Sequence, residues 1–371
     1  MGSAELTTFG QWGKRSDMLV HEQEPFNAEP PTDALAGQAV TAVDTFYSRN
    51  HGPIPQLDPA AWRLRVAGLV DRELELSLTD LQDRFEQRSL VATLQCAGNH
   101  RSGLLEVRDI PGEDPWGPGA TSTAQWTGVA LADVLTAAGA RAAAAHVAFS
   151  APDISTLADP AQPYGSSIPM SKARSGEVLL VLAMNGQPLP AAHGAPVRVV
   201  VPGYIGARSV KWVQGVTVQA EPSDNYFQAT AYRLLPVDTD PDTAGPGVGL
   251  SLGPVALNSA VLRPADGAAV PSGPVEVSGY AFAGDDRTVA RVDISADGGS
   301  TWAQADLEEQ QSPWAWRLWH SRLTLPIGRA EIVVRAWDST GALQPALPEH
   351  VWNPKGYVNN SWHRIHVTAR S

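Results

Sequence analysis

The stretch Ser89–Leu105, SLVATLQCAGNHRSGLL, contains the one cysteine of the 371-residue chain. Its first half, LVATLQC, has the apolar and β-branched character of a strand, and the polar AGNHR segment after it predicts a loop. Cys96 therefore stands where a strand ends. An amide (Asn99), an imidazole (His100) and a guanidinium (Arg101) follow it. The question is what a single thiol does beside hydrogen-bond donors and a cation.

The overall composition excludes several classes of protein. The net charge is −12, from 27 Lys and Arg against 39 Asp and Glu, which disfavours wholesale nucleic-acid binding. No stretch approaches the roughly 18 apolar residues of a membrane-spanning helix. A single cysteine excludes intrachain disulfides, and it excludes zinc or iron–sulfur sites built from several thiolates. The N-terminal MGSAELTTFGQWGKRSDMLV has no apolar signal core, which fits a cytoplasmic protein or a periplasmic one without its leader.

Length and pattern predict two domains, because 371 residues exceed a usual single core. Residues 1–40 are polar and punctuated by proline, so we expect an extended arm. Residues 41–235 alternate strands with short helices and predict a mixed α+β domain. Residues 236–250, PVDTDPDTAGPGVGL, have the composition of a linker. Residues 251–371 contain short alternating strands and a DGGS hairpin signal, which predict an all-β immunoglobulin-like sandwich.

Two helices are expected in the first domain. The segment LSLTDLQDRF predicts a short helix with Thr79 as its N-cap. The segment TGVALADVLTAAGARA predicts an amphipathic helix that ends at Gly139.

Cys96 has three interpretations. A lone cysteine is most often a small buried hydrophobe. The polar flanks and the neighbouring His100 and Arg101 favour instead a thiolate of lowered pKa. A nucleophile would need a histidine base, and a ligand of a soft metal would need a cofactor to supply the other ligands. The residues alone leave the thiolate roles of ligand and nucleophile open.

Three further segments gather cations and N–H donors in expected loops. They are FYSRNHGPIP (46–55), HGAPVRVVVPG (193–203) and WNPKGYVNNSWHRIHV (352–367). Each alone also fits a polar loop or an edge strand. Together they hold the groups that bind phosphate, pyrophosphate and small oxyanions. Arginines in such loops of an acidic protein predict a local anion pocket.

In their order along the chain, these motifs resemble the sulfite oxidase family of molybdenum enzymes, in its bacterial type without a haem domain. The matching stretches are FYSRNHGPIP, TLQCAGNHR, PW at 115–116, GATSTAQWTG, YGSSIP, MNGQPLPAAHGAPVRVVVPGYIGARSVKW and the terminal WHR. The pair CAGNxR and NGxPLPxxHGxPVRxxVPG is the specific part. The resemblance implies a molybdopterin-binding domain followed by an immunoglobulin-like dimerisation domain, and hence a homodimer.

The resemblance also implies roles for single residues. Cys96 matches the thiolate ligand of molybdenum, and the molybdenum-molybdopterin cofactor (Mo-MPT) would supply the remaining sulfurs. The positions that match cofactor anchors are Asn50, His51, Asp153 (with Asp159 as the fallback), His193, Arg198, Ser209 and Lys211. The positions that match the catalytic pocket are Tyr232 (with Tyr226 nearby), Arg49, Arg101, Arg364 and, as a wall, Trp116. His100 stands where the family often has a second arginine, which would alter the charge of the pocket.

The implied activity is the oxidation of sulfite to sulfate, with two electrons passed to an external acceptor such as cytochrome c or oxygen. An external acceptor is expected because the sequence contains no cytochrome b5-like segment and no CxxCH haem-attachment motif. The alternative is a related molybdopterin reductase that acts on nitrate or a sulfoxide. Two other classes are a metal-free anion-binding or adhesion protein and a cysteine hydrolase.

Overall fold

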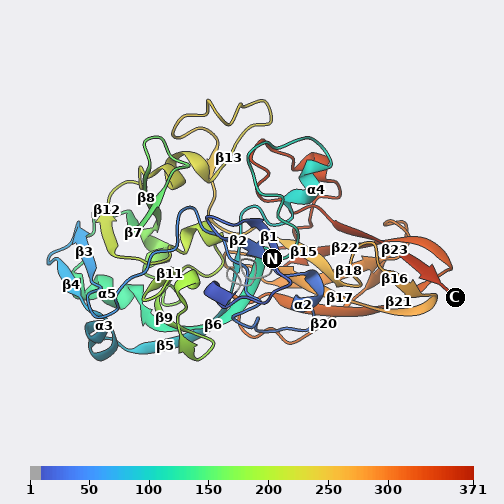
Figure 1. Cartoon of the computed structure of the whole chain (residues 1–371), viewed down its shortest axis with the longest axis horizontal. Coiled ribbons are helices and arrows are strands. Elements are labelled where there is room, and N and C mark those ends of the chain that lie inside the picture. The colour runs from blue at the N-terminus through green and yellow to red at the C-terminus, as the bar shows by residue number, and fades with distance from the viewer. Residues whose placement is uncertain (1–9) are drawn as a thin grey trace, which may run out of the picture.

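The computed structural model describes residues 10–371, which form two lobes (Figure 1). The first lobe, coloured blue to yellow, holds two five-stranded sheets, the small sheet of β1 (Leu19–Glu22) and β2 (Asn27–Glu29), and all but one of the helices and helical turns of the described chain. The second lobe is the elongated orange-to-red body made of strands, and the C-terminus lies at its far end. Within residues 10–371, no helix is both long and apolar enough to cross a membrane.

The first lobe contains two five-stranded sheets. One has the order β10-β9-β6-β5, with β11 paired to β9; its strands are β5 (Gln87–Gln95), β6 (Thr121–Ala130), β9 (Leu179–Met184), β10 (Gln187–Pro188) and β11 (Arg198–Val200). The other has the order β4-β3-β12-β7-β8; its strands are β3 (Leu64–Gly68), β4 (Leu74–Leu76), β7 (His146–Ser155), β8 (Gln162–Pro169) and β12 (Gly215–Gln219). In these two sheets only the pair β12/β3 is parallel. The predicted mixed α+β character is confirmed.

The helices of this lobe are short. They are α2 (Thr32–Leu35), α3 (Leu78–Arg84), α4 (Arg101–Leu105), α5 (Leu131–Ala138) and α6 (Met170–Ala173), with the turns η1 (Ala191–His193), η2 (Gly206–Arg208) and η3 (Phe227–Ala231). The predicted N-cap Thr79 is wrong, because Ser77 caps α3 and forms a capping box with Asp80. Gly139 ends α5 as predicted, at a φ of 70° that favours glycine.

Residues 10–40 do more than extend along the surface. They form the antiparallel pair β1 (Leu19–Glu22) and β2 (Asn27–Glu29) as well as α2. The arm also reaches the second lobe, where Arg263 donates to the carbonyl of Asp33 at 3.0 Å. Residues 1–9 of the predicted arm lie outside the described residues.

The second lobe is a sandwich of two sheets. One has the order β15-β17-β21-β20; its strands are β15 (Asn258–Arg263), β17 (Gly273–Phe282), β20 (Asp306–Leu307) and β21 (Arg317–Leu325). The other has the order β16-β23-β22-β18-β19; its strands are β16 (Ala269–Pro271), β18 (Val289–Ser295), β19 (Ala303–Gln304), β22 (Gly328–Asp338) and β23 (His363–Arg370), and the turn η4 (Pro348–His350) precedes β23. Buried side chains such as Val277, Trp319 and Ile332 fill the space between the sheets. The predicted all-β second body is confirmed.

Between the lobes, β13 (Arg233–Leu234) pairs with β14 (Leu250–Ser251). The intervening residues 236–249 have neither helix nor strand and extend as the gold loop above β13 in Figure 1. The domain boundaries given above, after residues 40, 235 and 250, stay predictions.

Tyr280 of β17 joins the two lobes next to the Cys96 loop. Its hydroxyl accepts from Asn99 Nδ2 at 3.0 Å and donates to the carbonyl of Pro118 at 3.1 Å. The His100 ring lies 3.1 Å from the same hydroxyl and packs edge-on against His363 of β23. His100 therefore belongs to the contact between the lobes and brings no charge to an anion pocket, because burial lowers its pKa well below the ordinary value.

We predict that acid weakens the protein through this histidine pair. Burial also lowers the pKa of His363 to about 4. In the unfolded chain the histidine binds a proton near its usual pKa of about 6.5, whereas the folded protein does so only near pH 4. The contribution of the neutral histidine to the free energy of unfolding is therefore complete above pH 6.5 and is lost as the pH falls towards 4. The urea midpoint should fall over this window. His363→Asn, which keeps an acceptor for the Val261 amide, should flatten the dependence. An unchanged pH slope in this variant would contradict the assignment.

Candidate active site

Ten of the thirteen predicted site residues line one cavity in the first lobe. Its wall is built from the loop after β2, from the end of β5 and from the segment around η2. Strands β7, β8 and β11 and the residue directly before β13 add one side chain each. The lining includes Arg49, Asn50, His51, Cys96, Asp153, Tyr164, His193, Arg198, Ser209, Lys211 and Tyr232. All except Tyr164 were named from the sequence. Segments far apart in the chain thus converge on the thiol.

Cys96 lies at the junction that the sequence indicated, directly after β5. Its amide donates to the carbonyl of Ala120 at 2.9 Å, which fixes the strand end, and its Sγ accepts from the amide of Gly98 at 3.4 Å. Burial raises the pKa of the thiol, and the nearby Arg49 and Arg101 oppose that shift. Among residues 10–371 no histidine is hydrogen-bonded to Sγ. A free thiol of raised pKa without a base does not suit a hydrolase nucleophile.

A bed of buried cations forms the floor of the cavity. Arg198 donates to the carbonyls of His193 and Ser209, both at 3.0 Å, and Lys211 donates to the carbonyls of Arg49 (3.0 Å) and Ala192 (3.1 Å). Within the described chain, neither Arg198 nor Lys211 forms an ion pair with a carboxylate. Burial lowers the pKa of Arg198 to about 10 and that of Lys211 well below its ordinary value. A bound anion would relieve this uncompensated charge.

Asp153 of β7 places in the same cavity a hydrogen-bond acceptor that has no donor among the described residues. Its Oδ1 atom is buried and has no hydrogen-bond partner among residues 10–371. Burial raises the pKa of this carboxyl to about 7, against the lowering effect of Lys211. Asp159, the fallback of the sequence analysis, is exposed and does not line the cavity. The arrangement favours Asp153 as an acceptor for the N–H groups of a bound heterocycle.

Tyr232 and His51 form a short hydrogen-bonded pair, with 2.5 Å between the phenol oxygen and Nε2. Burial raises the pKa of Tyr232 and lowers that of His51 well below its ordinary value, so the pair is a neutral phenol and a neutral imidazole. The imidazole is stacked on Tyr164 with ring centroids 4.5 Å apart. Tyr226 packs on Phe227 and does not line this cavity.

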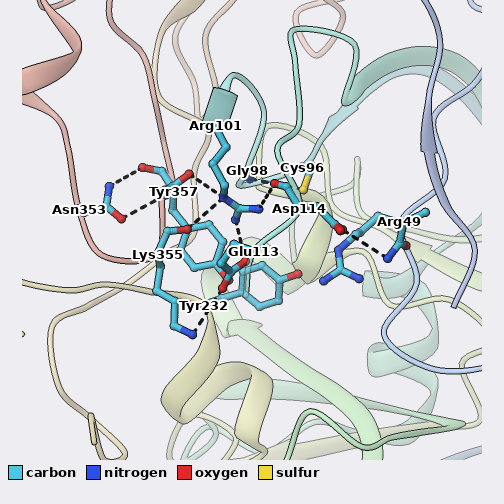
Figure 2. Close-up of polar contacts among 12 residues, drawn as sticks. Arg49, Cys96, Gly98, Arg101, Glu113, Asp114, Tyr232, Asn353, Lys355 and Tyr357 are labelled. Atoms are coloured by element: carbon cyan, nitrogen blue, oxygen red, sulfur yellow. Dashed lines mark hydrogen bonds and ion pairs between the residues drawn. The ribbon is translucent and has the colours of Figure 1, made fainter. Parts of the chain in front are cut away.

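A second cavity adjoins the first and forms its mouth. It shares Arg49, His51 and Tyr232 with the inner cavity, and its other lining residues include Glu22, Glu24, Glu113, Asp114, Lys355 and Tyr357. Figure 2 shows Lys355 and Tyr357 of the second lobe facing Tyr232 and Glu113 of the first. The mouth is therefore built by both lobes.

Three predicted residues do not line either cavity. Arg101 is buried behind the mouth and forms an ion pair with Glu113 at 3.1 Å. Trp116 is fully buried and packs edge-on against His21, so it is not the predicted wall. The pocket role predicted for Arg364 is wrong. Its strand, β23, alternates faces, and Arg364 points outward to Glu331 of β22 at 3.3 Å.

Two residues that the predictions left without a role lie at the site. Lys355, from the same WNPKGYVNNSWHRIHV motif as Arg364, is the cation that the second lobe brings to the mouth. Lys14 of the arm donates to the carbonyls of Val43 and Phe46 and to Nε2 of His193, each at 2.7 Å. Burial lowers the pKa of Lys14 to about 7. The quoted motif could have indicated Lys355, whereas nothing local distinguishes Lys14.

Comparison with known proteins identifies the family. Residues 51–227 match the family model described as oxidoreductase molybdopterin binding domain, and residues 253–370 match the one described as Mo-co oxidoreductase dimerisation domain. The chain is 37% identical to the sulfite oxidase of Arabidopsis thaliana over 374 residues, which cover 95% of this chain and 94% of that protein. The chain belongs to the sulfite oxidase family.

Other members agree with this assignment. The mitochondrial sulfite oxidase of Mus musculus is 44% identical over 362 residues, which cover 94% of this chain and 65% of the mouse protein. The chain thus spans slightly less than two thirds of that relative's length. The solved structure of the sulfane dehydrogenase SoxCD from Paracoccus pantotrophus matches with a TM-score of 0.80 at 25% identity, covering 95% of this chain and 89% of that one.

As a sulfite oxidase family member, the chain has molybdenum-molybdopterin as its cofactor, and the inner cavity fits that group. The cationic floor suits the phosphate of a pterin cofactor, the unpartnered Asp153 Oδ1 suits ring N–H groups, and the single thiol suits a soft metal. Within residues 10–371 no cluster of three or more His, Cys, Asp or Glu side chains could hold a metal ion. A metal held by Cys96 would therefore need its other ligands from the cofactor.

Asp153 offers a test of this fit. Asp153→Ala should retain much less cofactor after purification, because it removes a buried carboxylate oxygen that lines the cavity and has no partner among residues 10–371. Molybdenum content by elemental analysis and pterin content by fluorescence after oxidation measure the retention. Asp159→Ala is the matched control on the exposed neighbouring loop and should retain as much as the unmodified protein. Equal cofactor content in the two variants would remove Asp153 from the binding site.

Proposed function

We propose that this protein oxidises sulfite to sulfate and passes two electrons to an external acceptor, with Cys96 as the protein's ligand to molybdenum. The observation that carries the proposal is the position of Arg49. It lines both cavities, and Cys96 lines the inner one with it, so Arg49 places a positive charge between the mouth and the thiol. A small anion that enters through the mouth is thereby drawn towards the thiol and the metal that it holds.

The residues of the chain have distinct roles in this proposal. Asn50, His51, Asp153, His193, Arg198, Ser209 and Lys211 hold the cofactor. Arg49 and Lys355 attract and orient the substrate anion, with Arg101 behind them. When bound, the cofactor supplies the oxygen that is transferred to sulfur and takes up two electrons.

Tyr232 serves as a proton holder at the boundary of the two cavities. Because burial raises its pKa, the phenol stays protonated and donates a hydrogen bond to an oxygen of the substrate or to a water. The neutral His51 ring lies 2.5 Å from the phenol oxygen and fixes its orientation. The pair can therefore position a proton beside the reacting oxygen without adding charge.

The partners follow from the same proposal. The second lobe, which matches the dimerisation-domain family, joins two copies of the chain as a homodimer. Cytochrome c and oxygen are the candidate electron acceptors. Cytoplasm and periplasm both stay predictions for the compartment.

Cys96→Ser tests the proposed ligand. A hydroxyl binds a soft metal poorly, so sulfite-dependent reduction of cytochrome c or ferricyanide should be lost even where pterin stays bound. Turnover and molybdenum content are measured on the same preparations. Near-normal turnover by the variant would refute the ligand role. A wild-type enzyme that reduces nitrate but does not oxidise sulfite would favour the reductase alternative.

A pair of substitutions in the second lobe tests the corrected cation. Lys355→Met should raise the KM for sulfite by roughly ten-fold, because a charge-assisted contact to the anion is lost. Arg364→Met should leave the KM unchanged, since Arg364 faces Glu331 on the outer sheet. Steady-state kinetics at constant ionic strength give both values. A raised KM in the Arg364 variant alone would restore the original prediction.

A further inference from the structure

Main-chain carbonyls hold the guanidinium of Arg101 through Nε and Nη1, which leaves Nη2 for a side-chain partner. Nε donates to the carbonyls of Lys355 at 3.1 Å and Gly356 at 3.2 Å, and Nη1 donates to the carbonyl of Asp114 at 2.8 Å. These contacts come from both lobes and hold the group in place. Only Nη2 is directed to a side chain, the carboxylate of Glu113, at 3.1 Å. Figure 2 shows this arrangement beside the Cys96 loop.

Lys355 meets the same carboxylate from the other side. Its Nζ lies 3.4 Å from Oε1 of Glu113, while Arg101 Nη2 contacts Oε2 (Figure 2). Within residues 10–371, Glu113 is the one carboxylate that forms an ion pair with Lys355. A single carboxylate therefore neutralises two cations at the mouth, in the manner of a small oxyanion bound between them.

The effect of Glu113 extends to the reacting end of the mouth. Burial, and next to it the negative charge of Glu113, raise the pKa of Tyr357 well above its ordinary value. The same carboxylate is among the charges that act on Arg49 and Tyr232. It lines the mouth cavity, so it occupies the space that a substrate anion would cross.

The loop that carries Glu113 is anchored upstream by the buried Ile110 and downstream by hydrogen bonds to Glu29, and Gly112 lies directly before Glu113. Downstream, the amides of Gly117 and Gly119 donate to the carboxylate of Glu29 at 2.6 and 2.9 Å. Upstream, Gly112 has a φ of 77° and open space around the position of a Cβ. The side chain of Glu113, 15% exposed, can thus leave its two cations while the anchored part of the loop stays in place.

We propose that Glu113 is an internal competitor of the substrate anion. Its carboxylate occupies the pair formed by Arg101 Nη2 and Lys355 Nζ in the resting enzyme and yields to an incoming oxyanion. Arg101 keeps its three backbone contacts when Glu113 leaves, so the cation site is already formed. Because the anion must displace a carboxylate, Glu113 lowers the affinity for substrate and product alike. The proposal rests on the proposed function of this site.

Sulfate titration of the holoenzyme by calorimetry tests the competition without turnover. Glu113→Gln keeps the size of the side chain and removes its charge, and it should bind sulfate roughly ten-fold more tightly than the unmodified enzyme. Glu331→Gln, which removes a carboxylate from the ion pair with Arg364 in the second lobe, is the matched control and should bind as the unmodified enzyme does. Lys355→Met added to Glu113→Gln should abolish the gain.

Sulfate binding by Glu113→Gln that is equal or weaker would overturn the proposal and assign Glu113 to the permanent positioning of Arg101. Should Glu113→Gln fail to fold, Glu113→Asp, which keeps the charge on a shorter side chain, should bind sulfate more tightly than the unmodified enzyme; unchanged or weaker binding by that variant would equally overturn the proposal. Sulfite turnover of the unmodified enzyme is measured separately. Its absence would remove the proposed function and leave the sulfate comparison readable.

Discussion

The burial of positive charge without protein counterions is the constraint on which the site depends. Taking a cation out of water is costly unless it is paired or hydrogen-bonded. In the inner cavity the protein meets this requirement with main-chain carbonyls, which hold Arg198, Lys211 and Lys14 at 2.7–3.1 Å. Carbonyls orient a cation but bring no opposite charge, and burial lowers the pKa of all three groups. The cavity is therefore prepared for an anion that the protein itself does not supply.

This constraint explains why so many chain segments meet at one place. The carbonyls that hold the cations belong to the loop after β2, to η1 and to the segment after η2, and the arm adds Lys14. The second lobe contributes in the same way, since the carbonyls of Lys355 and Gly356 hold Arg101. Tyr280 fixes the Cys96 loop against β17. The contact between the lobes is thus a structural element of the site.

The sequence allowed prediction of the parts that depend on local pattern. The alternation of apolar and polar residues predicted the strands of both lobes. The motifs around Cys96, His193 and Lys211 predicted most of the residues that line the inner cavity. The prediction failed where the answer depended on direction or on distant contacts. Thr79 and Ser77 are both N-cap residue types, and each has a polar side chain three residues later, Gln82 and Asp80; the structure forms the capping box at Ser77. In the motif WNPKGYVNNSWHRIHV, Arg364 lies on β23 and points outward to Glu331, whereas Lys355 lies in the loop before β23 and lines the mouth.

In the part of the chain that the structure describes, the cations of the inner cavity have no carboxylate partner, whereas Arg101 and Lys355 at the mouth share Glu113. We relate this difference to how long each ligand stays bound. A cofactor that stays bound allows the inner cations to remain without a protein carboxylate, since their charge is neutralised throughout the life of the enzyme. A substrate and its product must enter and leave in every turnover. If Arg101 and Lys355 had no counterion of their own, the product dianion would be held tightly and released slowly. In the proposed competition, the Glu113 carboxylate, 3.1 and 3.4 Å from these cations, neutralises them between turnovers and makes the departure of the product less costly. Weakened binding at the mouth is then a condition for turnover, and strong uncompensated charge is confined to the floor of the cavity.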